Sequence, residues 1–282
     1  MRKIPASIAA LLLLTACGNG SSESDNAADK PVLLTSVVPQ TDILKEIAGD
    51  GYTVMTMLDR GADPESFDPA PDRLRRAADA DIYFATGVLP FEERIRTALP
   101  DDVRVLSLAD SVDLITGTHG DELETDPHIW TSARTLRAMA RQYCSALSDI
   151  CPDSTSAYTE RRDAVIARID SVDAAVGARL SGAPHAFGVW HPSLSYFARD
   201  YGLRQISVGA GHKETSPRHL RAAIDSLRAS GATVVFFENE GERARVEAIC
   251  ENAGTRAVGL QLGNGNPIDN LNIIADEIAR PQ

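Results

Sequence analysis

Two histidines and one glutamate stand in turn-rich phrases that suit metal binding. His128 lies in DPHIW, His191 in VWHP and Glu65 in GADPESFDP. Imidazole nitrogens and a carboxylate oxygen together suit a borderline cation such as zinc. Ligands collected from distant parts of a chain meet only after folding, so the sequence predicts a metal site that exists only in the folded protein.

Each of these residues also has an ordinary structural role open to it. Glu65 alone fits a turn in a proline-rich loop, and His128 fits a solvated side chain or one bonded to a backbone carbonyl. His191 fits a strand-end histidine that orients the start of a helix. All three, however, follow predicted strands, and ligands of open α/β sheets bind at the carboxyl ends of strands. This shared placement favours a common site.

The elements that must position these residues alternate between short apolar runs and helical patterns. Strands are expected at residues 32–38, 52–58, 82–86, 103–106, 186–190, 205–208, 233–237 and 256–260. Helices are expected at 42–48, 72–78, 91–99, 134–148, 193–201, 217–229, 243–252 and from 269 onward. Alternation of this kind predicts parallel sheets with helices on both faces.

One long helical stretch interrupts the alternation between residues 154 and 180. Its apolar residues, spaced by three and four, are Val165, Ile169, Val172, Val176 and Leu180. Such a helix would be about 40 Å long. We therefore expect an α/β fold of two doubly wound lobes joined by one long backbone helix, with the metal site in the inter-lobe cleft. The boundaries predicted are 31–153 for the N-terminal lobe, 154–182 for the linking helix and 183–282 for the C-terminal lobe.

The first residues indicate where the protein works. Residues 1–16 have a basic start and a short apolar run, which is typical of a signal peptide. They end in Leu-Thr-Ala before Cys17, which looks like a bacterial lipobox, so we expect Cys17 to carry the lipid. Residues 17–30 form a polar, flexible tether. The alternative is an ordinary signal peptide with an incidental cysteine. We expect an extracytoplasmic protein anchored to a bacterial membrane, on the periplasmic side in a Gram-negative cell.

The net charge of −12 limits the kinds of partner that the protein can be expected to bind. A negative field argues against nucleic acid and against docking on an anionic membrane surface. We expect contact with a membrane only through the lipid anchor, and a monomer in solution.

Three cysteines remain after Cys17, and their odd number leaves at least one unpaired within the chain. Cys144 and Cys151 flank the expected end of a helix, and we expect a disulfide between them, with Cys250 free and buried. The sequence has no C-x-x-C pair, so a cysteine zinc cluster is not expected.

The ligand phrases also carry a family resemblance. GADPESFDP, DPHIW and HPSLSYFARDYGL resemble motifs of the ZnuA-like family, the solute-binding lipoproteins of zinc or manganese ABC importers. The resemblance covers nearly the whole mature chain. It implies two lobes, a linking helix and a metal held between the lobes by His128 and His191. It also implies a non-enzymatic protein that captures Zn²⁺, or less readily Mn²⁺, and delivers it to an ABC permease in the cytoplasmic membrane.

Two positions depart from the family pattern. Glu65 stands where the family has its first histidine, and Gln261 stands at the late aspartate position. A neutral amide is a poor zinc ligand, so the fourth ligand stays open between water, the second oxygen of Glu65, Glu238 and Glu240. Two imidazoles and one carboxylate favour zinc over manganese, which prefers more oxygen ligands.

Two other functions use similar residues. Two histidines, a glutamate and an open position also describe a zinc-dependent hydrolase. An adhesin or scaffold lipoprotein with a structural metal is the other alternative. The sequence contains neither H-E-x-x-H nor G-x-S-x-G, which favours transport over hydrolysis.

Overall fold

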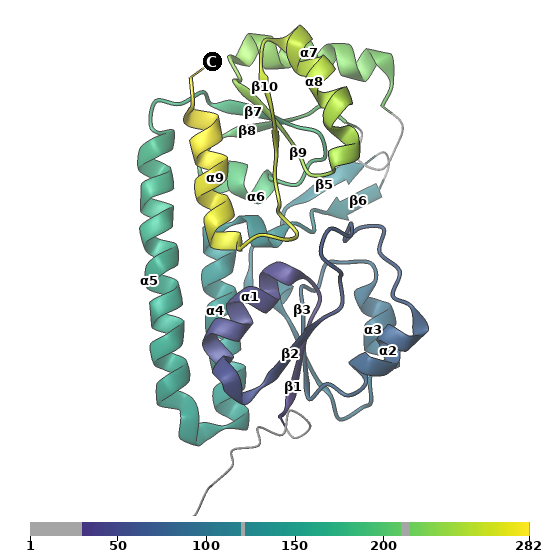
Figure 1. Cartoon of the computed structure of the whole chain (residues 1–282), viewed down its shortest axis with the longest axis vertical. Coiled ribbons are helices and arrows are strands. Elements are labelled where there is room, and N and C mark those ends of the chain that lie inside the picture. Colours follow the sequence, from purple (N-terminus) through teal and green to yellow (C-terminus); the bar gives the residue numbers. More distant parts are fainter. Residues whose placement is uncertain (1–29, 120–121, 210–214, 282) are drawn as a thin grey trace, which may run out of the picture.

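The computed structural model describes residues 30–119, 122–209 and 215–281. It contains two four-stranded parallel sheets, each with helices on both faces, and a long helix beside them (Figure 1). The predicted fold class, two α/β lobes with one long helix, is confirmed. Cys17 and the predicted signal peptide lie outside the described residues. Within the described ranges, no helix is both long enough and apolar enough to span a membrane.

The N-terminal lobe is built on the first sheet. Its strands lie in the order β2 (Thr53–Thr56), β1 (Val32–Thr35), β3 (Ile82–Ala85) and β4 (Arg104–Ser107). Helices α1 (Val38–Ala48) and α4 (Ala133–Ile150) cover one face, and α2 (Pro71–Ala77) and α3 (Glu92–Ala98) cover the other (Figure 1). Because all four strands are parallel, their carboxyl ends meet at one edge of the sheet.

The C-terminal lobe repeats this arrangement. Its strands lie in the order β10 (Arg256–Gly259), β9 (Val234–Phe237), β7 (Ala186–Val189) and β8 (Arg204–Ser207). Helices α7 (Pro217–Ser230) and α8 (Arg243–Ala253) cover one face, and α6 (Ser195–Asp200) and α9 (Pro267–Ala279) lie on the other (Figure 1).

Strand β9 shows why these strands read as unbroken apolar runs. Val235 and Phe237 join the apolar cluster beneath α7 and α8. Val234 and Phe236 point the other way, into the larger core. Successive strand residues face opposite sides of a sheet, so a strand buried on both faces is apolar throughout.

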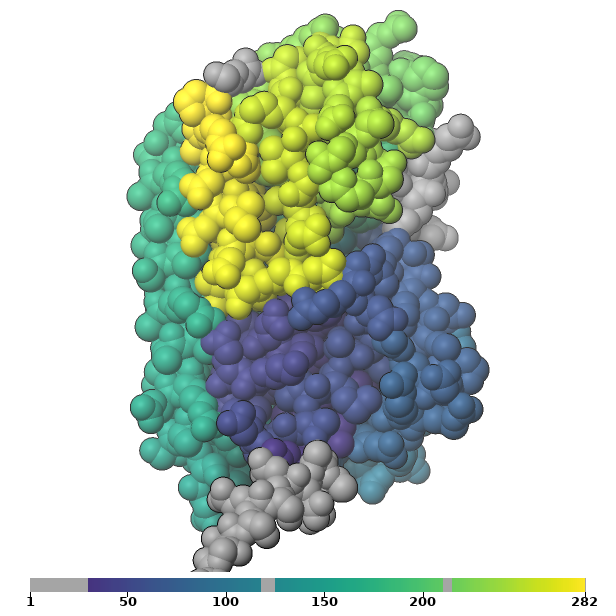
Figure 2. Space-filling view, viewed as in Figure 1, coloured from purple at the N-terminus to yellow at the C-terminus, as the bar shows by residue number. Residues whose placement is uncertain are grey.

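Helix α5 (Thr155–Leu180) has 26 residues, or about 39 Å, and begins after the 3-10 turn η5 (Pro152–Ser154). It runs along both lobes and packs against α4 and α9 (Figures 1 and 2). Ile169 and Val176 on its inner face are fully buried. One apolar cluster combines residues of α4, α5, α9 and both sheets. The linking helix therefore packs against both lobes along its length.

Two paired strands lie between residues 116 and 125, a stretch in which we expected neither a strand nor a helix. Strand β5 (Thr116–His119) pairs with β6 (Glu122–Thr125) in antiparallel fashion. The two strands contain mostly polar residues, so no apolar run in the sequence predicts them. The hairpin returns the chain to Asp126, two residues before His128.

The predicted disulfide between Cys144 and Cys151 is wrong. Helix α4 continues to Ile150, and Cys151 is its C-cap. Cys151 follows Cys144 by seven positions, or about 10 Å along the helix axis, which is beyond the roughly 7 Å that a disulfide allows between Cα atoms. Both are free thiols, and the Cys151 thiol donates to Ser154 Oγ at 3.3 Å. Cys250 is free and buried, as expected.

Candidate metal centre

Glu65 lies in the loop between β2 and α2, where a side-chain turn shapes the backbone. The carboxylate of Asp63 accepts hydrogen bonds from the backbone N–H of Glu65 at 2.9 Å and from Ser66 Oγ at 2.7 Å. An Asp that bonds the backbone two residues on is a common way to hold a tight turn. The Glu65 side chain is 24% exposed.

His128 follows the hairpin and precedes the 3-10 turn η4 (Ile129–Thr131). The Asp126 carboxylate accepts from the backbone N–H and from ring Nδ1 of His128, both at 2.9 Å. An ionised carboxylate only accepts hydrogen bonds, so Nδ1 carries the proton. In the neutral ring the lone pair is then on Nε2, which is the atom nearest Glu65.

His191 comes directly after the end of β7. The backbone N–H of Trp190 still donates to the Phe236 carbonyl of β9 at 2.7 Å, which continues the ladder to the residue before His191. The N–H of Ser193 then donates to the His191 carbonyl at 2.8 Å, in a tight turn. The sheet order reverses direction at β7 and β9, and open α/β sheets bind ligands at such switch points.

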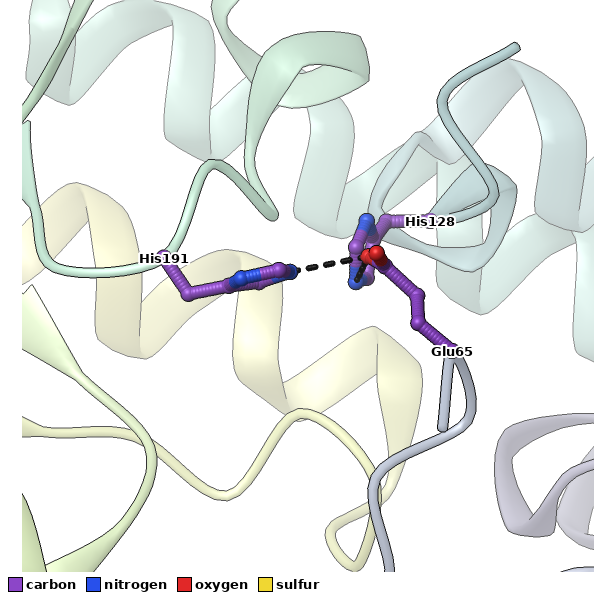
Figure 3. A group of neighbouring side chains, drawn as sticks. All are labelled: Glu65, His128 and His191. Atoms are coloured by element: carbon purple, nitrogen blue, oxygen red, sulfur yellow. Dashed lines mark hydrogen bonds and ion pairs between the residues drawn. The ribbon is translucent and has the colours of Figure 1, made fainter. Parts of the chain in front are cut away.

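The structure brings the three predicted ligands together. Each residue offers one donor atom, and these atoms all lie within 4.8 Å of one another. Glu65 Oε1 is 2.9 Å from His191 Nε2 and 3.5 Å from His128 Nε2. Figure 3 shows the contacts of the Glu65 carboxylate with the two imidazoles. Glu65 and His128 come from the N-terminal lobe and His191 from the C-terminal lobe, so the cluster bridges the two.

Electrostatics tie His128 to its carboxylate neighbours. Burial acts most strongly and lowers the pKa of His128, which is 4% exposed. The hydrogen bond and charge of Asp126, with the charges of Glu238 and Glu65, outweigh burial, so the pKa of His128 is raised. Burial raises the pKa of Asp126, but its bonds to His128 and Ser195 and the charge of His128 give a net lowering. The pair therefore favours an ionised Asp126.

A cavity of about 370 Å³ borders the cluster between the two lobes. Its wall includes both histidines and the apolar residues Leu58, Trp130, Trp190, Leu260 and Leu262. Loops at the carboxyl ends of β2, β9 and β10 complete the wall, so the cavity lies between the two facing sheet edges.

The further ligand candidates lie on this wall, outside the cluster of three. Glu238 lines the cavity and acts on His128 through its charge. Glu240 also lines it, but its carboxylate accepts two hydrogen bonds from Arg243 at 2.7 Å. Gln261 Oε1 accepts from Asn264 Nδ2 at 3.1 Å.

Sequence reasoning missed Asp126 and Tyr196 as parts of this site. The signal for Asp126 was present, because an Asp two residues before His128 can accept from its backbone and its ring. Tyr196 had no such signal, since its hydroxyl donates to the Asp126 carbonyl, 70 residues away in the sequence, at 2.8 Å.

The chain is similar to known proteins along most of its length. A family model described as "ZnuA: Zinc-uptake complex component A periplasmic" matches residues 33–273. The chain is 24% identical to zinc-binding lipoprotein AdcA of Streptococcus pneumoniae (strain ATCC BAA-255 / R6), over 96% of this chain and 56% of AdcA. It is 22% identical to manganese-binding lipoprotein MntA of Halalkalibacterium halodurans, over 94% of this chain and 93% of MntA. The chain thus spans little more than half the length of AdcA.

Solved structures share the architecture. A crystal structure of ZnuA superposes with a TM-score of 0.80 and 27% identity, covering 89% of this chain and 98% of that chain. A manganese-bound periplasmic metal binding protein from candidatus Liberibacter asiaticus gives 0.77 and 22%, with the same coverage. At that lower identity the similarity shows the fold alone.

Proposed function

The chain belongs to the ZnuA family, and from this premise we propose that it captures Zn²⁺ outside the cytoplasm and delivers the ion to an ABC-type importer. Relatives along most of the chain are named as zinc-binding and manganese-binding lipoproteins. The observation that carries the proposal is the convergence of Glu65, His128 and His191 from both lobes.

The spacing of the three donors supports a tetrahedral zinc ion. Two donors that are each about 2.1 Å from a tetrahedral zinc ion lie about 3.4 Å apart. Glu65 Oε1 is 2.9 and 3.5 Å from the two imidazole nitrogens, so these two pairs lie within about half an ångström of that spacing, and the two nitrogens lie within 4.8 Å of each other. Two nitrogen donors and one oxygen donor favour Zn²⁺ over Mn²⁺, because manganese prefers more oxygen ligands.

The fourth position in this proposal belongs to water, to the second oxygen of Glu65 or to Glu238, which lines the cavity and acts on His128 through its charge. Glu240 is paired with Arg243, and the side chain of Gln261 is a neutral amide bonded to Asn264. Three protein ligands with an exchangeable fourth position suit an ion that must also be released. Because the ligands come from both lobes, separating the lobes would break the coordination shell and free the ion.

The proposal includes a lipid on Cys17 and an ABC permease as the receiving partner. Substituting Cys17→Ser tests the anchor, because the variant should leave the membrane fraction and keep its zinc affinity. Retention of the variant in the membrane fraction would reject the lipid assignment.

Metal binding is tested by titrating chelator-treated protein with zinc. We expect saturation at one ion per chain, and weaker binding by Glu65→Gln, which loses the anionic oxygen but keeps the side-chain shape. A cell that lacks the protein should grow poorly in zinc-limited medium and recover with the parent chain. Unaltered zinc affinity in both His128→Ala and His191→Ala would reject the site.

A further inference from the structure

Asp126 is held at each of its polar groups. Its backbone N–H donates to the Ile115 carbonyl at 2.9 Å, and its own carbonyl accepts from Tyr196 Oη at 2.8 Å. Its carboxylate accepts from the backbone N–H and from ring Nδ1 of His128, both at 2.9 Å. With its side chain only 13% exposed, Asp126 has little freedom to rotate away from the ring of His128.

Tyr196 ties this arrangement to the C-terminal lobe. It lies in α6, is completely buried, and also accepts a hydrogen bond from the backbone N–H of Ile115 at 3.2 Å. One phenol therefore bonds both chain segments at the base of the hairpin, at Ile115 and at Asp126. It stands five residues after His191 in the same short segment.

From these contacts we infer that Asp126 and Tyr196 are positioning residues for the metal site. Asp126 holds the His128 ring with Nε2 toward Glu65, and Tyr196 holds Asp126. Residues 191–196 thus supply one ligand, His191, and set the orientation of another. The inference rests on the proposed function, because it concerns the same three ligands.

The arrangement has a consequence for release of the ion. A ligand ring that is already oriented loses less rotational freedom on binding, which raises affinity. A displacement of residues 191–196 would withdraw His191 and loosen the support of His128 in the same movement. Two of the three ligands would weaken together.

Competition against a chromophoric chelator measures the effect on zinc affinity. Asp126→Ala should weaken binding about 10- to 100-fold, the range for loss of an outer-shell partner. Asp126→Asn should lie between this variant and the parent, because the amide oxygen still accepts but carries no charge. Tyr196→Phe should weaken binding about two- to tenfold, the value of the one hydrogen bond that its phenol donates to Asp126.

Tyr201→Phe is the matched control, because its phenol donates to Asp173 at 2.6 Å, away from the metal ligands. It should bind zinc like the parent. If Tyr196→Phe also binds like the parent, the role of Tyr196 is overturned. Should Asp126→Ala fail to fold, Asp126→Asn and Tyr196→Phe still decide the inference.

A double-mutant cycle separates positioning from a general loss of structure. Asp126→Ala should cost nothing further in a His128→Ala background and should keep its cost in a His191→Ala background. Equal losses in both backgrounds would overturn the inference, because Asp126 would then act independently of His128.

Nitrogen NMR of metal-free protein gives a readout that does not depend on zinc. In the parent, neutral His128 should carry its proton on Nδ1, and Asp126→Ala should show a mixture of tautomers. A parent ring protonated on Nε2 would overturn the inference. A parent that shows the expected tautomer but binds no zinc would reject the proposed function and leave the positioning intact.

Discussion

At the scale of single residues, comparing His191 with His185 tests which histidine binds the metal. It follows the end of β7, whereas His185 is exposed just before the start of the same strand. We expect His191→Ala to weaken zinc binding by more than the roughly 100-fold that loss of an outer-shell partner can cost. His185→Ala should bind like the parent. Calorimetric titration of both variants makes the comparison, and equal affinities would remove His191 from the site.

The histidines also predict how binding depends on pH. Imidazole binds a metal only in its neutral form, and the pKa of His128 is raised above its ordinary value of about 6.5. Protons therefore compete with zinc at a higher pH than they would at a free histidine. Zinc affinity should rise with pH and level off only above the raised pKa of His128.

Intrinsic fluorescence can follow this titration. Trp130 and Trp190 are the two tryptophans of the chain, and both line the cavity beside the ligands. A zinc affinity that stays constant between about pH 5.5 and about pH 8 would contradict a histidine site.

At the scale of elements, the loop between β3 and α3 depends on one buried carboxylate. Glu92 is 3% exposed and accepts hydrogen bonds from Thr86 N at 2.6 Å, Gly87 N at 2.7 Å and Leu89 N at 3.2 Å. Glu92→Ala would leave the buried N–H groups of Thr86 and Leu89 and the more exposed N–H of Gly87 without their acceptor, so we expect a loss of about 2–4 kcal/mol in the free energy of unfolding.

Glu93→Ala is the control in the same helical turn, because the Glu93 side chain is 79% exposed. It should leave the free energy of unfolding close to that of the parent. Urea denaturation of both variants measures the difference. Similar midpoints for the two would show that the Glu92 contacts add little to stability.

Most elements were predictable from the sequence, because strands buried on both faces read as compact apolar runs. The expected strand at 186–190 is β7 at Ala186–Val189, and the expected helix at 217–229 is α7 at Pro217–Ser230. Ends were less accurate, and an error of two residues at the end of α4 made the Cys144–Cys151 disulfide look feasible. The hairpin was not predicted, because its mostly polar strands have no alternating apolar pattern in the sequence.

At the scale of the whole molecule, the two lobes share one core and one ligand cluster. An ion that binds only the folded chain stabilises it by mass action, by about 2.7 kcal/mol when free zinc is 100 times the dissociation constant. We therefore expect zinc to raise the melting temperature, progressively with its free concentration, and a chelator to reverse the shift.

Differential scanning calorimetry of parent and His191→Ala measures this coupling. The shift should be absent in the variant at the same zinc concentration. A parent melting temperature that does not respond to zinc would contradict a site built from both lobes. An equal shift in parent and variant would place the bound zinc elsewhere on the chain.

The sequence by itself determined the donor types, the alternation of strands and helices, and the long helix. These features are local, since each depends on residue type and on spacing within one segment. The tertiary structure decided that Glu65 contacts two imidazoles and that Asp126 and Tyr196 support His128. These outcomes depend on distances between segments. Glu65 and His191 are 126 residues apart in the chain and 2.9 Å apart at their donor atoms, because the carboxyl ends of the two parallel sheets face each other across one cavity.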